Sequence, residues 1–416
     1  MRRQNIGSMP YLRRFQGKSS MDVYQGKRAM RLLAALMALT AVVPNGPKRF
    51  VLAAFVAVIG LIAVRLHVTQ LTDVEPVDPE NKDRGIASFS DGECWTQMRF
   101  RKGDISRLMD ELTFPAVVVC ENGTRCSGEY ALCLLLFRMA YPTRLYDLQK
   151  VFGREYSQLS RIFAFAVAFL FDTHRDKVQG NVAWYAPRFD MYNAAIAQKV
   201  SDSPVNPANG FVPLELVEVF GFLDGSGLEI ARPHGNNNAQ LPFWNGYMHG
   251  SYIIFQGMSY PDGMVVIEGA FPGFYTDVVI WRDSIMRQQL EAVMVQRVAN
   301  GLPRLKLYAD KIYSTGSLVV AAYSLRNNRQ GLQPWMVEIN GIMSGIRIGV
   351  EWCFGKIVGS SKFVSFSRAM TLQKSPVNKF YHVAVLLANC HTCMYGGQHL
   401  GHFNVRPPTL NAYLSQ

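Results

Sequence analysis

Four acidic residues in the later part of the chain stand where a fold could bring their carboxylates together. With their local sequences they are Asp224 in VFGFLD, Asp277 in FYTDVV, Asp310 in LKLYAD and Glu351 in VEWCFG. Clustered carboxylates supply the oxygen ligands that hard cations such as Mg2+ and Mn2+ prefer. Two such ions can activate the attacking oxygen and stabilise the leaving oxygen when a phosphodiester is cut. Spacing alone leaves this chemistry and a chance scatter among the chain's 31 acidic residues equally open.

The elements around these acids indicate an α/β fold. The apolar run 217–224 predicts a buried strand that delivers Asp224 into the glycine turn GSG. Two further short strands, 251–256 and 264–268, are separated by the turn sequence YPDG, in which proline and glycine favour the required dihedrals. Downstream, the pattern predicts a helix, a strand and a second helix over 284–299, 304–309 and 346–357.

This order of elements is that of a ribonuclease-H-like fold. In that architecture, aspartates on the first and fourth strands meet near the centre of the sheet, and a later helix supplies a third acid. The order favours Asp224, Asp310 and Glu351 as catalytic residues and metal ligands. Asp277 lies between a strand and a helix, so we expect it to join the same rim from the side as a further metal ligand.

A helical region precedes the strands. The pattern is helical throughout 95–171, and one helix, 145–152, stops at Gly153 before a longer helix begins. Two helices joined by a short glycine turn are the layout of a helix-turn-helix, whose second helix enters the major groove of DNA. DNA contact and simple packing are equal alternatives for the polar residues that open the second helix: Ser157, Gln158, Ser160 and Arg161.

Composition and charge divide the chain further. A hydrophobic share of 49% and a charged share of 18% exclude wholesale disorder. Residues 1–49 hold ten Lys or Arg and one acid, so they carry +9 of the net +12 and form a basic arm suited to nucleic acid, an anionic membrane or an import receptor. The expected organisation has five parts. Residues 1–92 form the basic arm, apolar helices and linker, and residues 93–180 form a helix-turn-helix-like domain. A connector (181–215), a ribonuclease-H-like nuclease domain (216–395) and a C-terminal surface tail (396–416) follow.

Two apolar runs near the start, 32–43 and 50–64, are shorter than the roughly twenty residues that span a membrane. For these runs, a buried or interfacial helix is favoured over a membrane anchor. The arginine-rich, acid-poor start of the chain also resembles a transit peptide. The seven scattered cysteines suit a reducing compartment. Cys390 and Cys393, with His399 and His402, have the donor types of a zinc site, but their close spacing favours ordinary packing.

From about residue 95 onward the sequence resembles the Harbinger transposase-derived nucleases, a family of the DDE superfamily of transposable-element endonucleases. The segment that resembles the family's helix-turn-helix is YPTRLYDLQKVFGREYSQLSRIF. The blocks that resemble its nuclease are GFLDGSG, QLPFWNG with His249, FQ, PDG, FPGFYTD with DS, YADKIY and VEWCFGKI. The family pattern tends to have basic residues where Tyr247 and Met248 stand and smaller residues at Lys311 and Ile312, so the chain departs from the pattern at these positions.

The resemblance implies a nuclease that binds Mg2+ or Mn2+, acts on DNA, and carries its ligands at the four acidic positions. It also implies a nuclear protein, with a Myb-like DNA-binding protein as a candidate partner. Cytoplasm and a membrane tether through 50–64 are the alternative locations, and the sequence leaves self-association into a homo-oligomer open. Arg347 and Lys356 flank Glu351 and could steer a DNA phosphate, with surface ion pairing as an equal alternative. A catalytically silent, domesticated DNA-binding or partner-binding protein is the competing function.

Overall fold

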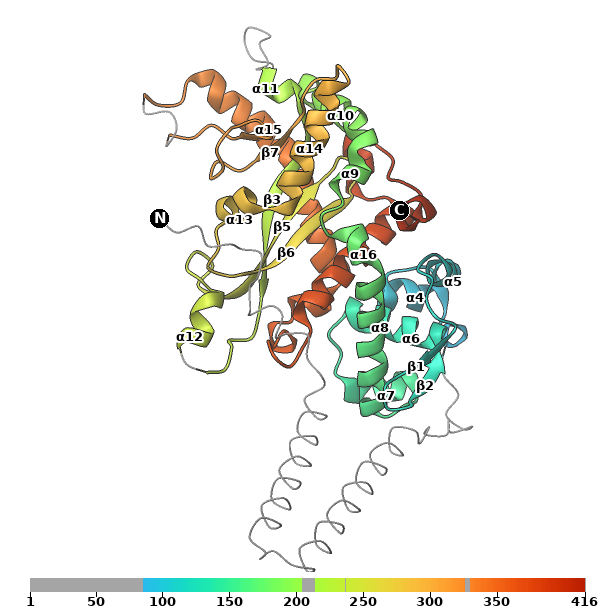
Figure 1. Ribbon diagram of the computed structural model, residues 1–416. Coiled ribbons are helices and arrows are strands. Elements are labelled where there is room, and N and C mark those ends of the chain that lie inside the picture. The colour runs from blue at the N-terminus through green and yellow to red at the C-terminus, as the bar shows by residue number, and fades with distance from the viewer. Residues whose placement is uncertain (1–84, 204–213, 236, 326–329, 416) are drawn as a thin grey trace, which may run out of the picture.

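The computed structural model describes residues 85–203, 214–235, 237–325 and 330–415 (Figure 1). The basic arm and both apolar runs lie outside the described residues. Among the residues that are described, no helix has the length and apolar character needed to cross a membrane.

The first part of the described chain is mainly helical. Its helices are α4 (Asp91–Met98), α5 (Lys102–Glu111), α6 (Gly128–Ala140), α7 (Leu145–Phe152), α8 (Tyr156–Val178), α9 (Val182–Tyr185) and α10 (Phe189–Ser201). A short antiparallel hairpin, β1 (Val117–Val119) with β2 (Arg125–Ser127), interrupts them, so the prediction of helix throughout was wrong here. The valine run favours a strand, and Gly123 takes the positive φ of 87° in the connecting turn.

The predicted helix pair is present. α7 spans Leu145–Phe152 and ends at Gly153, which has a φ of 73° and caps the helix in the left-handed conformation. α8 then begins at Tyr156. Within the stretch predicted as a connector, residues 181–203 contain α9 and α10. α10 packs on the sheet, and its Asn193 side chain donates hydrogen bonds to the carbonyls of Val217 and Val219, at 2.6 and 2.9 Å.

A mixed sheet forms the centre of the second part. Its strands are β3 (Val219–Glu229), β4 (Trp244–Asn245), β5 (Gly250–Ser259), β6 (Val265–Pro272), β7 (Lys306–Ala309) and β8 (Val319–Ala321). β5 pairs antiparallel with β3, β4 and β6, whereas β7 runs parallel to β3 and β8 parallel to β7. The main order across the sheet is therefore β6, β5, β3, β7, β8, with β3 in the middle.

β3 extends further than its sequence indicated. The strand continues past Asp224 to Glu229, and Asp224 pairs with Gly257 of β5. We expected a turn at Gly225 because glycine commonly breaks a strand. Here it stays in the strand and leaves room for a neighbouring group, which is the other common reason for a glycine inside a strand.

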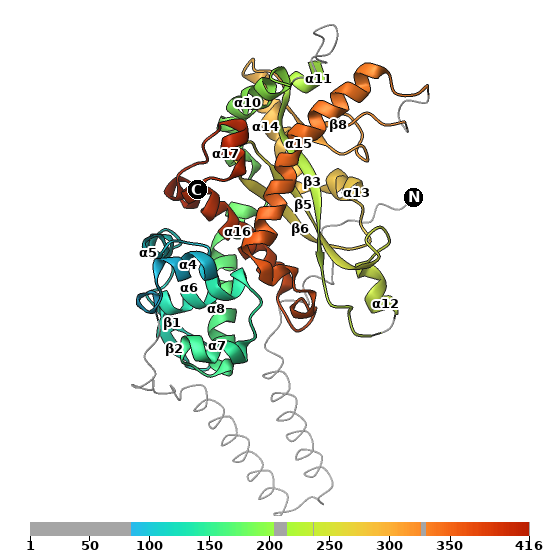
Figure 2. The ribbon, with the colours of Figure 1, turned by 180° about the vertical axis from the view of Figure 1, so that it is seen from behind.

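Helices cover both faces of the sheet. The helices that follow α10 in the described chain are α11 (Leu214–Val217), α12 (Asn237–Gln240), α13 (Asp277–Asp283), α14 (Ile285–Ala299), α15 (Pro334–Ser360), α16 (Val377–Tyr395), α17 (Gln398–Phe403) and α18 (Leu410–Leu414). α14 lies in front of the sheet in Figure 1, and α15 lies in front of it in the reverse view of Figure 2. The predicted helix bearing Glu351 is thus the second half of a much longer helix.

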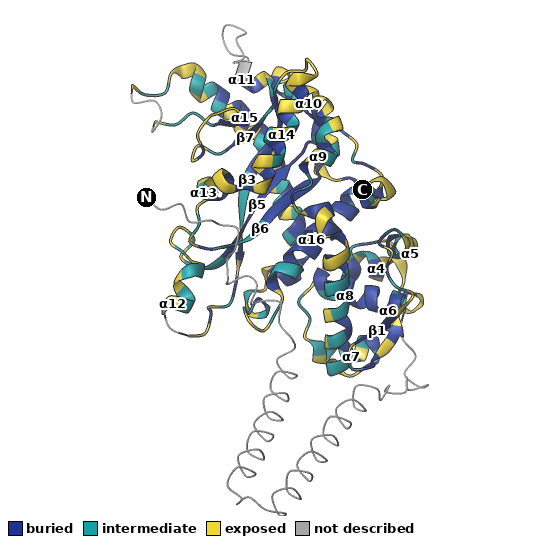
Figure 3. Ribbon diagram, in the orientation of Figure 1, coloured by how far each residue is buried: buried dark blue, intermediate teal, exposed yellow. Residues whose placement is uncertain are grey.

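The helical part and the sheet share one core of buried residues, and dark blue segments lie in both parts in Figure 3. Phe163 of α8 lies with its ring centroid 5.8 Å from that of Phe380 of α16. The last residues join this core, so the predicted surface tail was wrong. α18 buries Leu410, Tyr413 and Leu414, which share one helical face because they are spaced by three and four residues.

Candidate functional site

Two of the four acids come from neighbouring parallel strands. Leu223 of β3 is in register with Ala309 of β7, so the next residues, Asp224 within β3 and Asp310 directly after β7, lie side by side at the centre of the sheet, at the edge where β7 ends. Asp224 Oδ1 accepts a hydrogen bond from the Gly225 amide at 2.9 Å, and Asp310 Oδ1 accepts one from the Lys311 amide at 2.6 Å. Both carboxylates are partly buried.

Asp277 approaches from the other face of the sheet. It is the first residue of α13, and its carboxylate lies against Gly225, where an added Cβ would stand only 2.6 Å from Asp277 Cγ. Successive side chains of a strand point to opposite faces, so the direction of this absent side chain is opposite to that of Asp224. The structure therefore brings Asp277 to the edge of the sheet where β7 ends, which it shares with the other two aspartates, but places it on the opposite face of the sheet from Asp224.

α15 reaches the site on the Asp224 face. Gly257 is paired with Asp224, and the Phe354 ring of α15 lies against it, 2.7 Å from the position of an added Cβ. On the same helix, Arg347 Nη1 donates to Asp224 Oδ2 at 3.1 Å. Arg347 Nη2 lies 3.9 Å from Glu351 Oε1, and the Glu351 side chain is 66% exposed. Glu351 is thus linked to Asp224 only through the guanidinium of Arg347.

The aspartates influence one another electrostatically. Burial raises the pKa of Asp277 to about 6, and the negative charges of Asp224 and Asp310 add to this effect. Burial also raises the pKa of Asp224, against the lowering effect of the Arg347 cation. Negative charge at this edge is therefore costly, and a positive ligand would relieve the cost.

The donor chemistry of this edge fits Mg2+ or Mn2+, because all its ionisable donors are carboxylate oxygens. Within the described ranges, however, no group of three or more His, Cys, Asp or Glu side chains is arranged to hold a metal ion as it stands. Two features account for this arrangement. Arg347 occupies one oxygen of Asp224, and Glu351 points away into solvent.

The predicted DNA contacts do not gather around the acids. At the start of α8, Ser160 is exposed, whereas Ser157, Gln158 and Arg161 are partly buried. Figure 1 shows α7, which precedes them, at the lower end of the helical part and well apart from α13. These residues form a separate surface, so DNA contact there stays a prediction.

Lys356 faces inward. Its Nζ donates to Thr392 Oγ1 at 2.8 Å and to the Gly396 carbonyl at 2.9 Å, and burial lowers the pKa of this ammonium to about 8. These contacts give Lys356 a role in joining α15 to the end of α16. A DNA phosphate would have to displace both, so DNA contact by Lys356 stays a prediction that its present partners do not favour.

The cysteines and histidines near the C-terminus make packing contacts. His399 Nε2 lies 2.7 Å from the Gly349 carbonyl and 3.2 Å from the Sγ of Cys353. The imidazole of His402 meets Trp352 edge to face. Cys390 is fully buried in α16.

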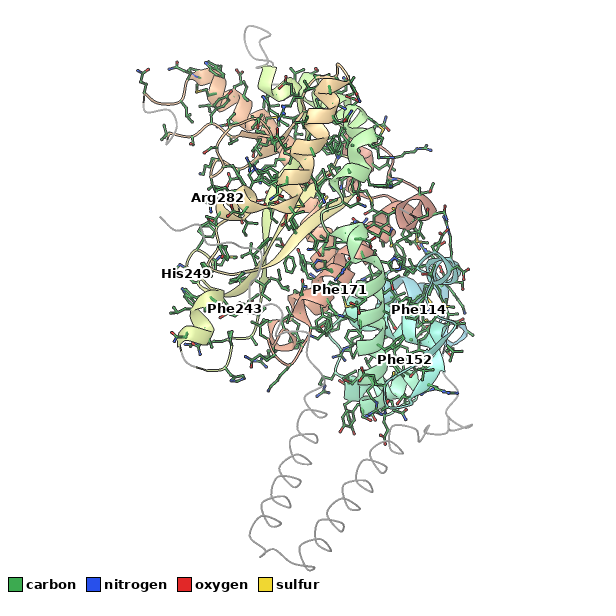
Figure 4. All side chains as sticks on the ribbon, viewed as in Figure 1. Phe114, Phe152, Phe171, Phe243, His249 and Arg282 are labelled. Carbon is green, nitrogen blue, oxygen red and sulfur yellow. The ribbon has the colours of Figure 1, made fainter. Side chains whose placement is uncertain are left out.

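Sequence reasoning missed two buried polar residues beside the aspartates, Gln256 and Tyr313. The available signal was a lone glutamine inside the apolar run IIFQGM. His249, by contrast, is exposed in the turn before β5, on the side of the molecule that also carries Arg282 in Figure 4.

Comparison with known proteins covers the same part of the chain. No curated protein and no solved structure matches the chain significantly. The family model described as DDE superfamily endonuclease matches residues 223–389, a stretch that includes all four acids, most of β3, and the whole of β7, α13 and α15. In this stretch the chain is similar to the DDE superfamily endonucleases.

Proposed function

We propose that the protein is a metal-dependent DNA endonuclease of the DDE transposase type, with Asp224, Asp310 and Glu351 as its catalytic residues. The observation that carries this proposal is the placement of Asp224 and Asp310 side by side on neighbouring parallel strands. The match of residues 223–389 to DDE superfamily endonucleases supports it. The sheet order also supports a ribonuclease-H-like fold, because three antiparallel strands are followed by two parallel ones and helices cover both faces.

Each residue would have a distinct part. Asp224 and Asp310 would hold the divalent cation through carboxylate oxygens, and Asp277 would support them from the opposite face. Bound Mg2+ or Mn2+ supplies Lewis-acid stabilisation of the oxygens that gain charge during phosphodiester cleavage. Arg347 links Asp224 to Glu351, so movement of this one guanidinium would free both carboxylates. Its planar donor group would then suit a DNA phosphate.

DNA binding would extend over the helical part. Ser157, Gln158, Ser160 and Arg161 would lie at the major groove if α7 and α8 act as a helix-turn-helix. The Harbinger type, a nuclear location and a Myb-like partner are proposals that rest on the family resemblance. The +9 charge of residues 1–49 supports contact with a polyanion.

The direct test is cleavage of supercoiled plasmid by the full chain, with Mg2+, with Mn2+ and with EDTA. We expect metal-dependent nicking that Asp224→Asn and Asp310→Asn reduce to background. Asp172→Asn is the matched control, because Asp172 lies on α8, away from the site, and its ion pair in the described part of the chain is with Lys379 at the surface. If folded wild-type protein shows no metal-dependent nicking, or both aspartate variants cut as well as wild type, the enzyme proposal is wrong.

A catalytically silent DNA-binding protein is the second candidate, and the ion pair between Arg347 and Asp224 favours it. That pair already neutralises the Asp224 carboxylate with a guanidinium in place of a metal ion. A silent protein would bind the plasmid in gel-shift assays and leave it uncut in both metals, so the same experiment separates the two functions.

A further inference from the structure

Gln256 is a polar residue at the centre of an otherwise apolar strand. It lies on β5, is completely buried, and pairs with Gly225 of β3. Its side chain therefore lies on the Gly225 face, the face from which Asp277 approaches. Burying an amide is costly unless its polar atoms find partners, so the partners of Gln256 show what it does.

The two hydrogens of the Gln256 amide go to two different segments. Nε2 donates to the backbone carbonyl of Asp277 at 3.0 Å and to the Tyr313 hydroxyl at 3.0 Å. The Tyr313 amide in turn donates to the Asp310 carbonyl at 3.1 Å. One side chain thus connects the start of α13, which carries Asp277, with the turn after β7, which carries Asp310.

We propose that Gln256 is a positioning residue that holds the Asp277 and Asp310 segments at a fixed separation across β3. The side chain acts as a brace. Gln256 pairs with Gly225 of β3, and because glycine has no side chain there is room beside it for the Gln256 amide to reach both segments. Gln256 Oε1 is buried and has no hydrogen-bond partner in the described part of the chain. The contacts that this side chain makes to the rest of the described chain are therefore those of its two N–H donors, one to each acid-bearing segment.

The chain offers a closely matched control in Asn389. This buried amide on α16 also donates to one backbone carbonyl and one phenol, those of Val265 at 2.8 Å and Tyr413 at 3.0 Å. It touches neither acid-bearing segment. Gln256→Met and Asn389→Leu each remove two donors and introduce an apolar side chain of similar size. Asn389→Leu also removes an acceptor, because Asn389 Oδ1 accepts from the Val265 amide at 3.1 Å, so it is the more severe change of the two.

The first measurement is amide hydrogen exchange of the full chain without metal, read by mass spectrometry. We expect Gln256→Met to speed exchange about tenfold in residues 277–283 and 310–316 together, as the loss of a buried hydrogen bond predicts. Asn389→Leu should leave both segments unchanged. Unchanged exchange in Gln256→Met, or a uniform increase across the whole sheet, would overturn the positioning role.

Tyr313→Phe keeps the test decisive if Gln256→Met does not fold. It removes one hydroxyl and leaves the bond between Gln256 and Asp277 intact. We expect faster exchange in 310–316 and unchanged exchange in 277–283. Equal change in the two segments, or none in 310–316, would contradict a brace made of two separate donors.

The consequence for catalysis rests on the proposed function. We expect Gln256→Met to weaken Mn2+ binding, measured by calorimetric titration, about tenfold or more, as substitutions behind metal ligands commonly do. Asn389→Leu should keep the wild-type affinity. If the wild-type protein binds no Mn2+ and cuts no DNA, the proposed function fails, while the exchange measurement still decides the role of Gln256. If Mn2+ binds equally to both variants, Gln256 does not position the metal ligands.

Discussion

At the scale of single residues, the aspartates at the site differ in how their charges are balanced. Asp224 accepts hydrogen bonds from Arg347 and from a backbone amide. Asp277 lies close enough to Asp224 and Asp310 for their negative charges to act on it, and in the described part of the chain no basic side chain pairs with it. Burial opposes both charges, but Arg347 offsets part of this cost at Asp224 and no basic group does so at Asp277 in the described part of the chain, which gives two opposite expectations for mutation.

Asp277→Asn should stabilise the protein at pH 7.5. The pKa of Asp277 is raised from its usual 3.8 to about 6, so the folded state holds a proton that the unfolded state has already lost between these values. Stability must then fall as the pH rises from about 4 to 6 and stay reduced above that. Removing this carboxylate should raise the free energy of unfolding at pH 7.5 by about 1–3 kcal/mol.

Urea unfolding at pH 4 and pH 7.5 measures this effect. The gain should vanish at pH 4, where the carboxyl is protonated in the folded state. A gain of equal size at both pH values would mean that the charge of Asp277 is not its cause. Metal-dependent cleavage should fall about ten- to a hundredfold in the same variant, the range seen for groups that support metal ligands.

Arg347→Gln should have the opposite effect on stability. The guanidinium lowers the pKa of Asp224, so its loss leaves a partly buried carboxylate without a counter-charge. We expect a loss of about 1–3 kcal/mol at pH 7.5 in urea unfolding. Arg304→Gln, which breaks a comparable pair with Glu291 on α14, should cost less than about 1 kcal/mol. Equal losses in both variants would show that Asp224 gains nothing special from Arg347.

At the scale of elements, close approach fixes the geometry of the site more than any single hydrogen bond. α13 can begin beside β3 only because Gly225 has no side chain. Gly225→Ala should push the Asp277 carboxylate away, lower the free energy of unfolding by about 1–3 kcal/mol and reduce cleavage. Gly103→Ala, in an exposed turn of α5 with open space around it, should instead stabilise slightly. Wild-type stability in Gly225→Ala would show that the site is looser than this contact implies.

The helix pair α7 and α8 provides a separate test of DNA binding. Ser157 and Ser160 begin α8, and replacing both with glutamate adds negative charge to the proposed groove-facing surface. We expect DNA affinity in fluorescence anisotropy to fall roughly tenfold at low salt and less at high salt. Ser201→Glu, at the exposed end of α10, should change it little. Equal affinity for the double variant would assign this corner to packing alone.

Elements that depend on local signals could be predicted from the sequence. α7 ends at Gly153 because glycine readily takes the left-handed conformation, and the spacing of apolar residues gave the order of strands and helices. The predicted strand ended too early, at Asp224, because Gly225 resembled a turn residue. α18 was not predicted, because its short apolar face can be recognised only from its packing against α8 and α16.

At the scale of the whole molecule, register decides which acids share a face. The sequence identified the four acidic positions, but the pairing of Asp224 with Gly257, and of Gly225 with Gln256, is a long-range property. That pairing places Asp277 on the opposite face from Asp224. It also brings the Gln256 side chain into contact with the segments that carry Asp277 and Asp310. No local pattern around Asp277 carries this information, so the expectation of a single four-acid patch could not be checked before the fold was known.

Manganese anomalous diffraction from crystals of the full chain tests the central claim most directly. The account predicts an anomalous peak between the carboxylates of Asp224 and Asp310, with Arg347 moved away from Asp224, and no such peak in Asp224→Asn crystals grown under the same conditions. Strong peaks elsewhere with the pair between Arg347 and Asp224 intact, or the same peak in Asp224→Asn, would contradict the assignment of this edge as the metal site.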